Sequence, residues 1–276
     1  MNKSIVFYIL LFLLLNMLFV PYKIIQCNRM LCAIRENDIN KLEQILKIAS
    51  PNCVPSTLIT TVAAESERYT PLSVACQEGN FEIVKLLVEN GADVNYAPIL
   101  SGTSPLGFAS ESDSADNLKI VKFLIENGAD ADFSKYKHSH PGFRALSTDG
   151  DELRPNGMEI LKELLKAGAD PNKEQLLQVA CVQKHEEVIR YLVEEWGYDA
   201  SDPRNICGYC YGIKEYSYET FKYFLERGAN PYEKYLSNKF KGEKSAIEHL
   251  QENSPEWAEK LIKLAAEYGF EESAER

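Results

Sequence analysis

The chain has 276 residues, of which 26% are charged and 45% are hydrophobic, and its formal net charge at pH 7 is −11. The acidic residues are spread along the sequence, and no basic stripe is available to neutralise phosphate groups. We therefore exclude nucleic acids and anionic lipid surfaces as expected partners, and we attribute the acidic excess to solubility.

The first 27 residues differ in character from the rest. Residues 1–4 carry one lysine, and residues 5–20 are all apolar except Asn16. A short positive end followed by an apolar stretch is typical of a secretory signal peptide. A single membrane anchor is the alternative, although Lys23 near the end of the apolar segment makes a spanning helix marginal. We expect residues 1–27 to be a signal peptide or an anchor, and the chain to be secreted or extracytoplasmic. Membrane contact is expected only through residues 1–27, if they are not cleaved.

After residue 28, one phrase recurs: an apolar run, then Gly-Ala-Asp or a close variant, then a turn residue. It occupies residues 83–95, 120–130, 160–170, 188–199 and 221–230. The spacing of its glycines ranges from 29 residues (Gly168 to Gly197) to 41 residues (Gly228 to Gly269). A phrase repeated at such intervals predicts an array of stacked units, each of which buries its apolar face against its neighbours.

The opening of the unit is clearest in Thr70-Pro71-Leu72-Ser73-Val74-Ala75. This segment resembles the Thr-Pro-Leu-His-x-Ala opening of ankyrin repeats, with Ser73 where the family usually has His. Thr70 can cap a helix, Pro71 suits the first helical position, and Gly91 can take the left-handed conformation that ends a helix. The resemblance implies an all-α fold: an ankyrin-repeat solenoid of helix-turn-helix units joined by β-turn or finger loops, over residues 28–276.

The expected repeats follow one another without a linker. The first begins near residue 30, the second covers about 70–95, and the third covers about 104–132, with Ser112–Ser114 as a longer turn. The fourth is the most degraded: no Thr-Pro-Leu opening is found, Pro141-Gly142 are interpreted as breakers, and an irregular loop insertion is expected over about 133–157, with a short helix near 143–147. After two further repeats, residues 245–276 are expected to form a C-terminal capping repeat. In all, six to seven repeats are expected.

Resemblance to ankyrin repeats also implies a function, because the family binds other proteins through its concave face. Transferred position by position, that face includes six residues of this chain, which are Ser73, Gln77, Tyr96, Phe133, Gln178 and Tyr209. The sequence has no Gly-x-Ser-x-Gly, no phosphate-binding glycine loop and no His-Glu-x-x-His. We expect a non-catalytic module with another protein as its partner, no cofactor, no metal and no small-molecule substrate.

Seven cysteines leave alternatives open. Cys207 and Cys210 fall on the register of Leu72 and Ala75, which favours helix packing. A Cys-x-x-Cys motif can also form a redox pair or half of a zinc site. Together with the His138/His140 loop, it supports the alternative of an extracytoplasmic thiol-redox or metal-binding protein. A membrane-tethered cytosolic scaffold is the third alternative.

Cys32 and Cys53 flank the second helix of the first repeat. Because export would place the chain in an oxidising compartment, these two cysteines are candidates for a disulfide that staples that helix.

Overall fold

The computed structural model describes residues 22–53, 69–98, 101–133, 135–136, 139–147, 153–170, 175–211, 215–236 and 243–272. The fold class is all-α: these residues form helices joined by turns, with one small hairpin. The chain divides into two compact units, residues 1–145 with 154–170, and residues 146–153 with 171–276.

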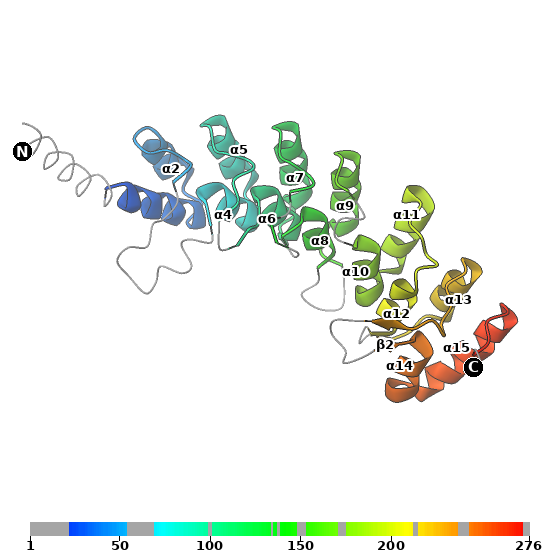
Figure 1. Ribbon diagram of the computed structural model, residues 1–276. Coiled ribbons are helices and arrows are strands. Elements are labelled where there is room, and N and C mark those ends of the chain that lie inside the picture. The colour runs from blue at the N-terminus through cyan, green and yellow to red at the C-terminus, as the bar shows by residue number, and fades with distance from the viewer. Residues whose placement is uncertain are drawn as a thin grey trace, which may run out of the picture. The chain divides into compact units, whose positions relative to one another are not determined.

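The first unit is built from helix-turn-helix pairs. Residues 22–35 are helical, and they are followed by α2 (Ile39–Leu46), α4 (Pro71–Glu78), α5 (Phe81–Glu89), α6 (Pro105–Glu111), α7 (Asn117–Glu126), α8 (Pro141–Leu146) and α9 (Gly157–Lys166). Within this unit α4, α6 and α8 lie in one row, and α2, α5, α7 and α9 lie in another (Figure 1). Consecutive members of a row pack together, α4 on α6, α5 on α7 and α7 on α9.

The start of α4 shows why the recurring opening forms a helix. The hydroxyl of Thr70 accepts a hydrogen bond from the Ser73 amide at 3.1 Å, and the Thr70 amide donates to the Ser73 hydroxyl at 2.6 Å. This reciprocal capping box satisfies two amides that the helix itself leaves unpaired. The Ser104 side chain also caps α6, by accepting from the Gly107 amide at 3.2 Å, without a reciprocal bond. The capping role predicted for Thr70 is confirmed.

The core of the first unit lies between the two rows. On α5, Ile83, Val84 and Leu87 are fully buried, and the equivalent residues of α7 are also fully buried: Ile120, Val121 and Leu124. Their spacing of one, three and four residues places them on one face of each helix. The helix α5 is followed by Gly91 with φ of +85°, a conformation that a side chain would resist.

An asparagine clamp links successive loops at two places in the first unit. The side-chain amide of Asn95 donates to the Gly128 carbonyl at 2.9 Å and accepts from the Asp130 amide at 2.8 Å. Asn52 makes the same pair of hydrogen bonds one repeat earlier, to the Gly91 carbonyl and the Asp93 amide, both at 2.8 Å. In each case a single side chain, which both donates and accepts, holds one loop in a fixed position relative to the next.

Replacing Asn95 by Ala is expected to destabilise this loop step by about 1 kcal/mol, the net value of the hydrogen bonds lost. Hydrogen exchange at the Asp130 amide should then speed up by several fold. Asn90→Ala is the matched control, because Asn90 bonds only within its own repeat, to the Leu86 carbonyl. Unchanged exchange at Asp130 in Asn95→Ala would show that the clamp contributes nothing.

The opening of the fourth repeat corrects the sequence analysis. The structure begins α8 at Pro141, in the place of Pro71, so Pro141-Gly142 do not break a helix. His140 stands in the place of Thr70, and its Nδ1 accepts from the Gly142 amide at 3.0 Å. The equivalence was missed because His replaces Thr and Gly replaces Leu. The helix expected near residues 143–147 exists and begins two residues earlier.

The second unit repeats the paired arrangement. Its elements are α10 (Leu176–Gln183), α11 (Glu186–Trp196), α12 (Pro203–Tyr211), α13 (Tyr218–Glu226), β1 (Tyr235–Leu236), β2 (Glu243–Lys244), α14 (Ala246–Asn253) and α15 (Pro255–Glu267). The helix α12 packs between α10 and α14, and α15 packs on α13 and α14. The strands β1 and β2 pair antiparallel, Tyr235 with Lys244 and Leu236 with Glu243.

The ends of the chain are described in part. Residues 1–21, which hold most of the expected signal peptide or anchor, lie outside the described residues, and the helical residues 22–35 follow directly. Among the described residues, no helix combines the length and the apolar character needed to cross a membrane. At the other end, α15 exposes Glu256, Glu259 and Lys260, and a capping role for residues 245–276 stays a prediction.

Candidate interaction surface

Three of the six expected surface residues lie on the first unit and reach solvent. Gln77 is exposed near the end of α4, Tyr96 is 40% exposed, and Phe133 is half-buried. Tyr96 and Phe133 occupy equivalent places, five residues after Gly91 and Gly128 respectively. Because the asparagine clamp fixes the two loops, it presents an aromatic side chain from each of two successive repeats.

Ser73 and Tyr209, two further expected surface residues, are fully buried, so this prediction was wrong for both. The Ser73 hydroxyl faces Thr70 in the capping box. The Tyr209 hydroxyl donates to Glu186 Oε1 at 2.9 Å and accepts from the Ser217 amide at 3.0 Å. Tyr209 stands in the place of Val74, which is also buried, and this register could have revealed its position.

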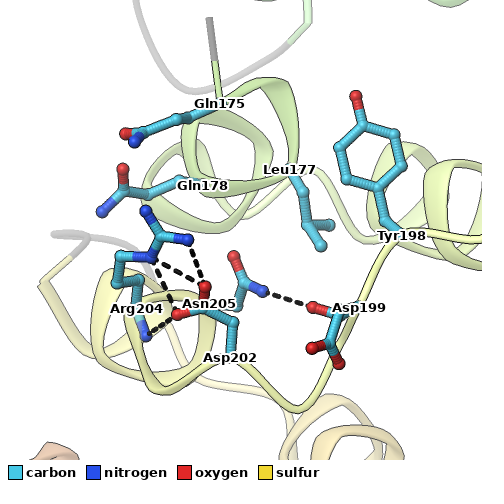
Figure 2. Close-up of a pocket in the computed structure, with 8 residues that line it drawn as sticks. All are labelled: Gln175, Leu177, Gln178, Tyr198, Asp199, Asp202, Arg204 and Asn205. Atoms are coloured by element: carbon cyan, nitrogen blue, oxygen red, sulfur yellow. Dashed lines mark hydrogen bonds and ion pairs between the residues drawn. The ribbon is translucent and has the colours of Figure 1, made fainter. Parts of the chain in front are cut away.

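The sixth residue, Gln178, lies on the second unit and lines a hollow of about 190 Å³. The other lining residues come from α10, from α12 and from the segment between α11 and α12: Gln175, Leu177, Tyr198, Asp199, Asp202, Arg204 and Asn205 (Figure 2). Apart from Gln178, the sequence analysis named none of these residues. Tyr198 and Asp199 belong to the recurring phrase, but no motif marks these residues as a site, because the hollow is formed only when two repeats come together.

One ion pair forms a wall of this hollow. The Arg204 Nε donates to both carboxylate oxygens of Asp202, at 2.9 and 2.7 Å, and its Nη2 contacts the same carboxylate. The hydrogen bonds from Arg204 lower the pKa of Asp202 below its ordinary value. Asp202 is therefore ionised at neutral pH, and its charge is balanced within the pair.

The thiols of Cys207 and Cys210 are fully buried on α12, and neither is in a disulfide. Burial raises the pKa of Cys207 to about 12 and that of Cys210 well above its ordinary value. Because the thiolate is the nucleophile and the metal ligand, such thiols are poorly suited to redox or metal chemistry. Their position supports the packing interpretation.

The raised pKa of Cys207 predicts a loss of stability at alkaline pH. Below pH 9 the thiol is protonated in both states. As the pH rises from 9 towards 12, the unfolded chain releases this proton and the folded chain retains it, so unfolding becomes easier by up to about 1.4 kcal/mol per pH unit. Both tryptophans lie in the second unit, so urea unfolding followed by tryptophan emission measures this loss.

The Cys207→Ala variant should show a shallower decline of stability between pH 9 and 11 than the native chain. Cys32→Ala, which removes an exposed thiol of the first unit, should leave the decline unchanged. Equal slopes in Cys207→Ala and the native chain would contradict the assignment.

The disulfide of the first unit differs from the one expected. Cys53 is bonded to Cys27 and not to Cys32, with 5.7 Å between the Cα atoms of the bonded pair. Cys27 shares the buried face of its helix with Met30 and Ile34. Cys32 lies five residues further on, about 140° around the helix, where it is exposed and free.

The His138/His140 loop takes another role in the structure. His140 is buried, with Nε2 3.2 Å from Asp132 Oδ1 and Nδ1 bonded to the Gly142 amide, so it supports the start of α8. His138 lies outside the described residues. Within the described part of the chain, no three His, Cys, Asp or Glu side chains are grouped so as to hold a metal ion.

The paired helices, the capped openings and the clamped loops can now be compared with known proteins. Residues 30–135 match the family model for ankyrin repeats, in three copies. The matched region holds α4 to α7, the asparagine clamp and the two loop aromatics. Ankyrin repeats generally bind other proteins, and proteins built from them are generally non-catalytic. The comparison with curated proteins gave no match.

Proposed function

We propose that this chain is a non-catalytic protein–protein interaction module that works outside the cytoplasm, and that Gln77, Tyr96, Phe133 and Gln178 contribute to its partner-binding surface. The observation that carries the proposal is the match of residues 30–135 to ankyrin repeats, combined with two aromatic side chains presented from clamped loops. Tyrosine and other aromatic residues concentrate binding energy when a partner covers them.

The location is supported by the Cys27–Cys53 disulfide. Disulfides persist in oxidising compartments and are rare in the cytosol. The apolar residues 5–20 provide a route of export. Because Cys27 makes this disulfide, any cleavage must fall before Cys27 and not after it, as the segment 1–27 would imply. Protease accessibility of a C-terminal tag in intact cells tests this part, together with the mass of the mature N-terminus. A tag on the cytosolic side of the membrane, in a chain that still begins at Met1, would overturn it.

The binding surface is tested by double replacement of Tyr96 and Phe133 with Ala. A partner captured by the native chain and identified by mass spectrometry should bind the double variant at least about tenfold more weakly, since truncating interface aromatics typically costs more than 1 kcal/mol each. Tyr218→Ala is the control, because Tyr218 is 44% exposed but starts α13, the second helix of its pair. If the partner binds the double variant as well as it binds Tyr218→Ala, Tyr96 and Phe133 are not part of the binding surface.

A further inference from the structure

The volume of the hollow in the second unit limits the size of the group that it can bind. Its volume of about 190 Å³ equals the liquid volume of about six water molecules. Sites for cofactors and drug-sized ligands typically measure about 300–1,000 Å³. The hollow can therefore receive one side chain of a partner protein, which makes this inference a refinement that rests on the proposed function.

Polar groups around the hollow have hydrogen-bonding capacity that the protein does not use. The side chain of Asn205 is 6% exposed, and its Nδ2 donates to the Asp199 carbonyl at 2.9 Å. Its Oδ1 points into the space between Leu177 and Arg204 (Figure 2). Gln175, which directly precedes α10, and Gln178 on its first turn add two amides at the rim (Figure 2). An amide oxygen that faces the hollow can accept a hydrogen bond from an incoming donor.

The charge around the hollow is negative. Asp202 and Arg204 neutralise each other in their ion pair, and Asp199 contributes one further carboxylate. Asp199 Oδ1 accepts from the Ser201 amide at 2.9 Å and from the Ser201 hydroxyl at 2.5 Å, so the capacity for a further donor lies on Oδ2 of this carboxylate. The net charge of these three side chains is −1, and that of the whole chain is −11. A cationic group is therefore attracted, and an anion is repelled.

The apolar lining adds a further selection. Leu177 and the ring of Tyr198 stand on the side of the hollow opposite Arg204 (Figure 2). Methylene groups can lie against such a wall while their charged end meets polar groups. A guanidinium carries five N–H donors in a planar fork, and this number matches the several oxygens of Asp199, Asn205, Gln175 and Gln178 better than the three donors of a lysine.

We propose that this hollow is a binding subsite for an arginine side chain of the partner protein, with Leu177 and Tyr198 against its methylene groups and the oxygens of Asn205, Asp199 and Gln178 on its guanidinium. The ion pair of Arg204 with Asp202 forms one wall of the subsite and keeps Arg204 from competing for Asp199.

The test uses the full chain labelled with ¹⁵N and the small probe N-acetyl-arginine methylamide. The probe should shift the side-chain amide signals of Asn205 and Gln178 in NMR spectra in a saturable manner. The citrulline analogue has nearly the same shape without the charge, and it should bind at least about fivefold more weakly, as expected where a charge contact is lost. The lysine analogue should fall between the two.

Two variants of equal charge separate the subsite from general attraction to an acidic protein. Asp199→Asn should weaken arginine binding about fivefold and leave citrulline binding unchanged. Glu256→Gln is the control, because Glu256 lies on the exposed face of α15 and pairs with Lys260, and it should leave both affinities unchanged. Gln178→Leu, at a half-buried position, should weaken arginine binding without affecting folding.

The proposal is overturned if arginine and citrulline bind equally, if Asp199→Asn and Glu256→Gln have the same effect, or if acetate shifts these signals more strongly than arginine does. Its failure differs from failure of the proposed function. If the chain captures a partner but does not bind the arginine probe, the proposed function stands and the subsite proposal is wrong. If the chain binds the probe but captures no partner, the subsite proposal stands and the proposed function is wrong.

Discussion

Replacing Tyr209 by Ala is expected to lower the free energy of unfolding of the second unit by about 3–5 kcal/mol, the usual range for a buried aromatic side chain. Its side chain is fully buried, and its ring centroid lies 5.3 Å from that of Phe221 and 6.1 Å from that of Phe224. Removal therefore leaves a cavity among aromatic rings and also breaks the hydrogen bonds to Glu186 and Ser217.

Tyr209→Phe separates the two contributions. It keeps the ring and removes the hydroxyl, so it is expected to cost about 1–3 kcal/mol through the unpaired Ser217 amide and Glu186 carboxylate. Trp257 lies in the same aromatic cluster, with its ring centroid 5.5 Å from that of Tyr216. Urea unfolding followed by tryptophan emission therefore measures the stability of both variants. A loss below 1 kcal/mol in Tyr209→Ala would contradict the packing described above.

Breaking the Cys27–Cys53 disulfide is expected to destabilise the first unit by about 3.5 kcal/mol, the value for a closed loop of this length in the chain-entropy description. The bond joins residues 26 apart, so its removal frees the helical residues 22–35 from the loop that follows α2. Cys27→Ser, Cys53→Ser and the double variant should lose similar amounts of stability, because any one of them removes the whole bond.

Cys32→Ser is the control, and it should change stability by less than about 0.5 kcal/mol, as is usual for an exposed side chain. Thermal unfolding followed by circular dichroism measures all four variants. Alkylation of the denatured native chain without reductant should modify five of its seven cysteines. Modification of all seven would show that the bond is absent.

Much of the first unit could be predicted from the sequence because its local signals agree with its tertiary structure. Thr70 and Pro71 favour the start of α4, Gly91 favours the end of α5, and the apolar spacing of Ile83 and Leu87 favours a buried face. The opening of α8 was not recognised because His140 provides a cap through a ring nitrogen, which the Thr-Pro-Leu pattern does not represent.

The residues that were misplaced depend on contacts between elements. The disulfide partner of Cys53 is decided by which face of the first helix is buried, a fact that the sequence gives only once the neighbouring helix is known. The burial of Tyr209 depends on the aromatic residues Phe221 and Phe224 of α13. The hollow beside Gln178 requires Asn205 and Arg204 from the next repeat, which no local pattern connects with α10.

The asparagine clamp makes the array sensitive to slow covalent ageing. Asparagine is among the thermolabile residues, and its deamidation turns the amide into a carboxylate that cannot donate a hydrogen bond. A carboxylate at residue 95 or 52 would still accept from the next loop, but it would meet the carbonyl of Gly128 or Gly91 with an unfavourable charge. The chain already contains such a step, because Asp132 accepts from the Asp170 amide at 3.0 Å in the place of an asparagine. In old or heat-treated protein, deamidated loops would therefore accept a hydrogen bond from the next loop without donating one, as Asp132 already does.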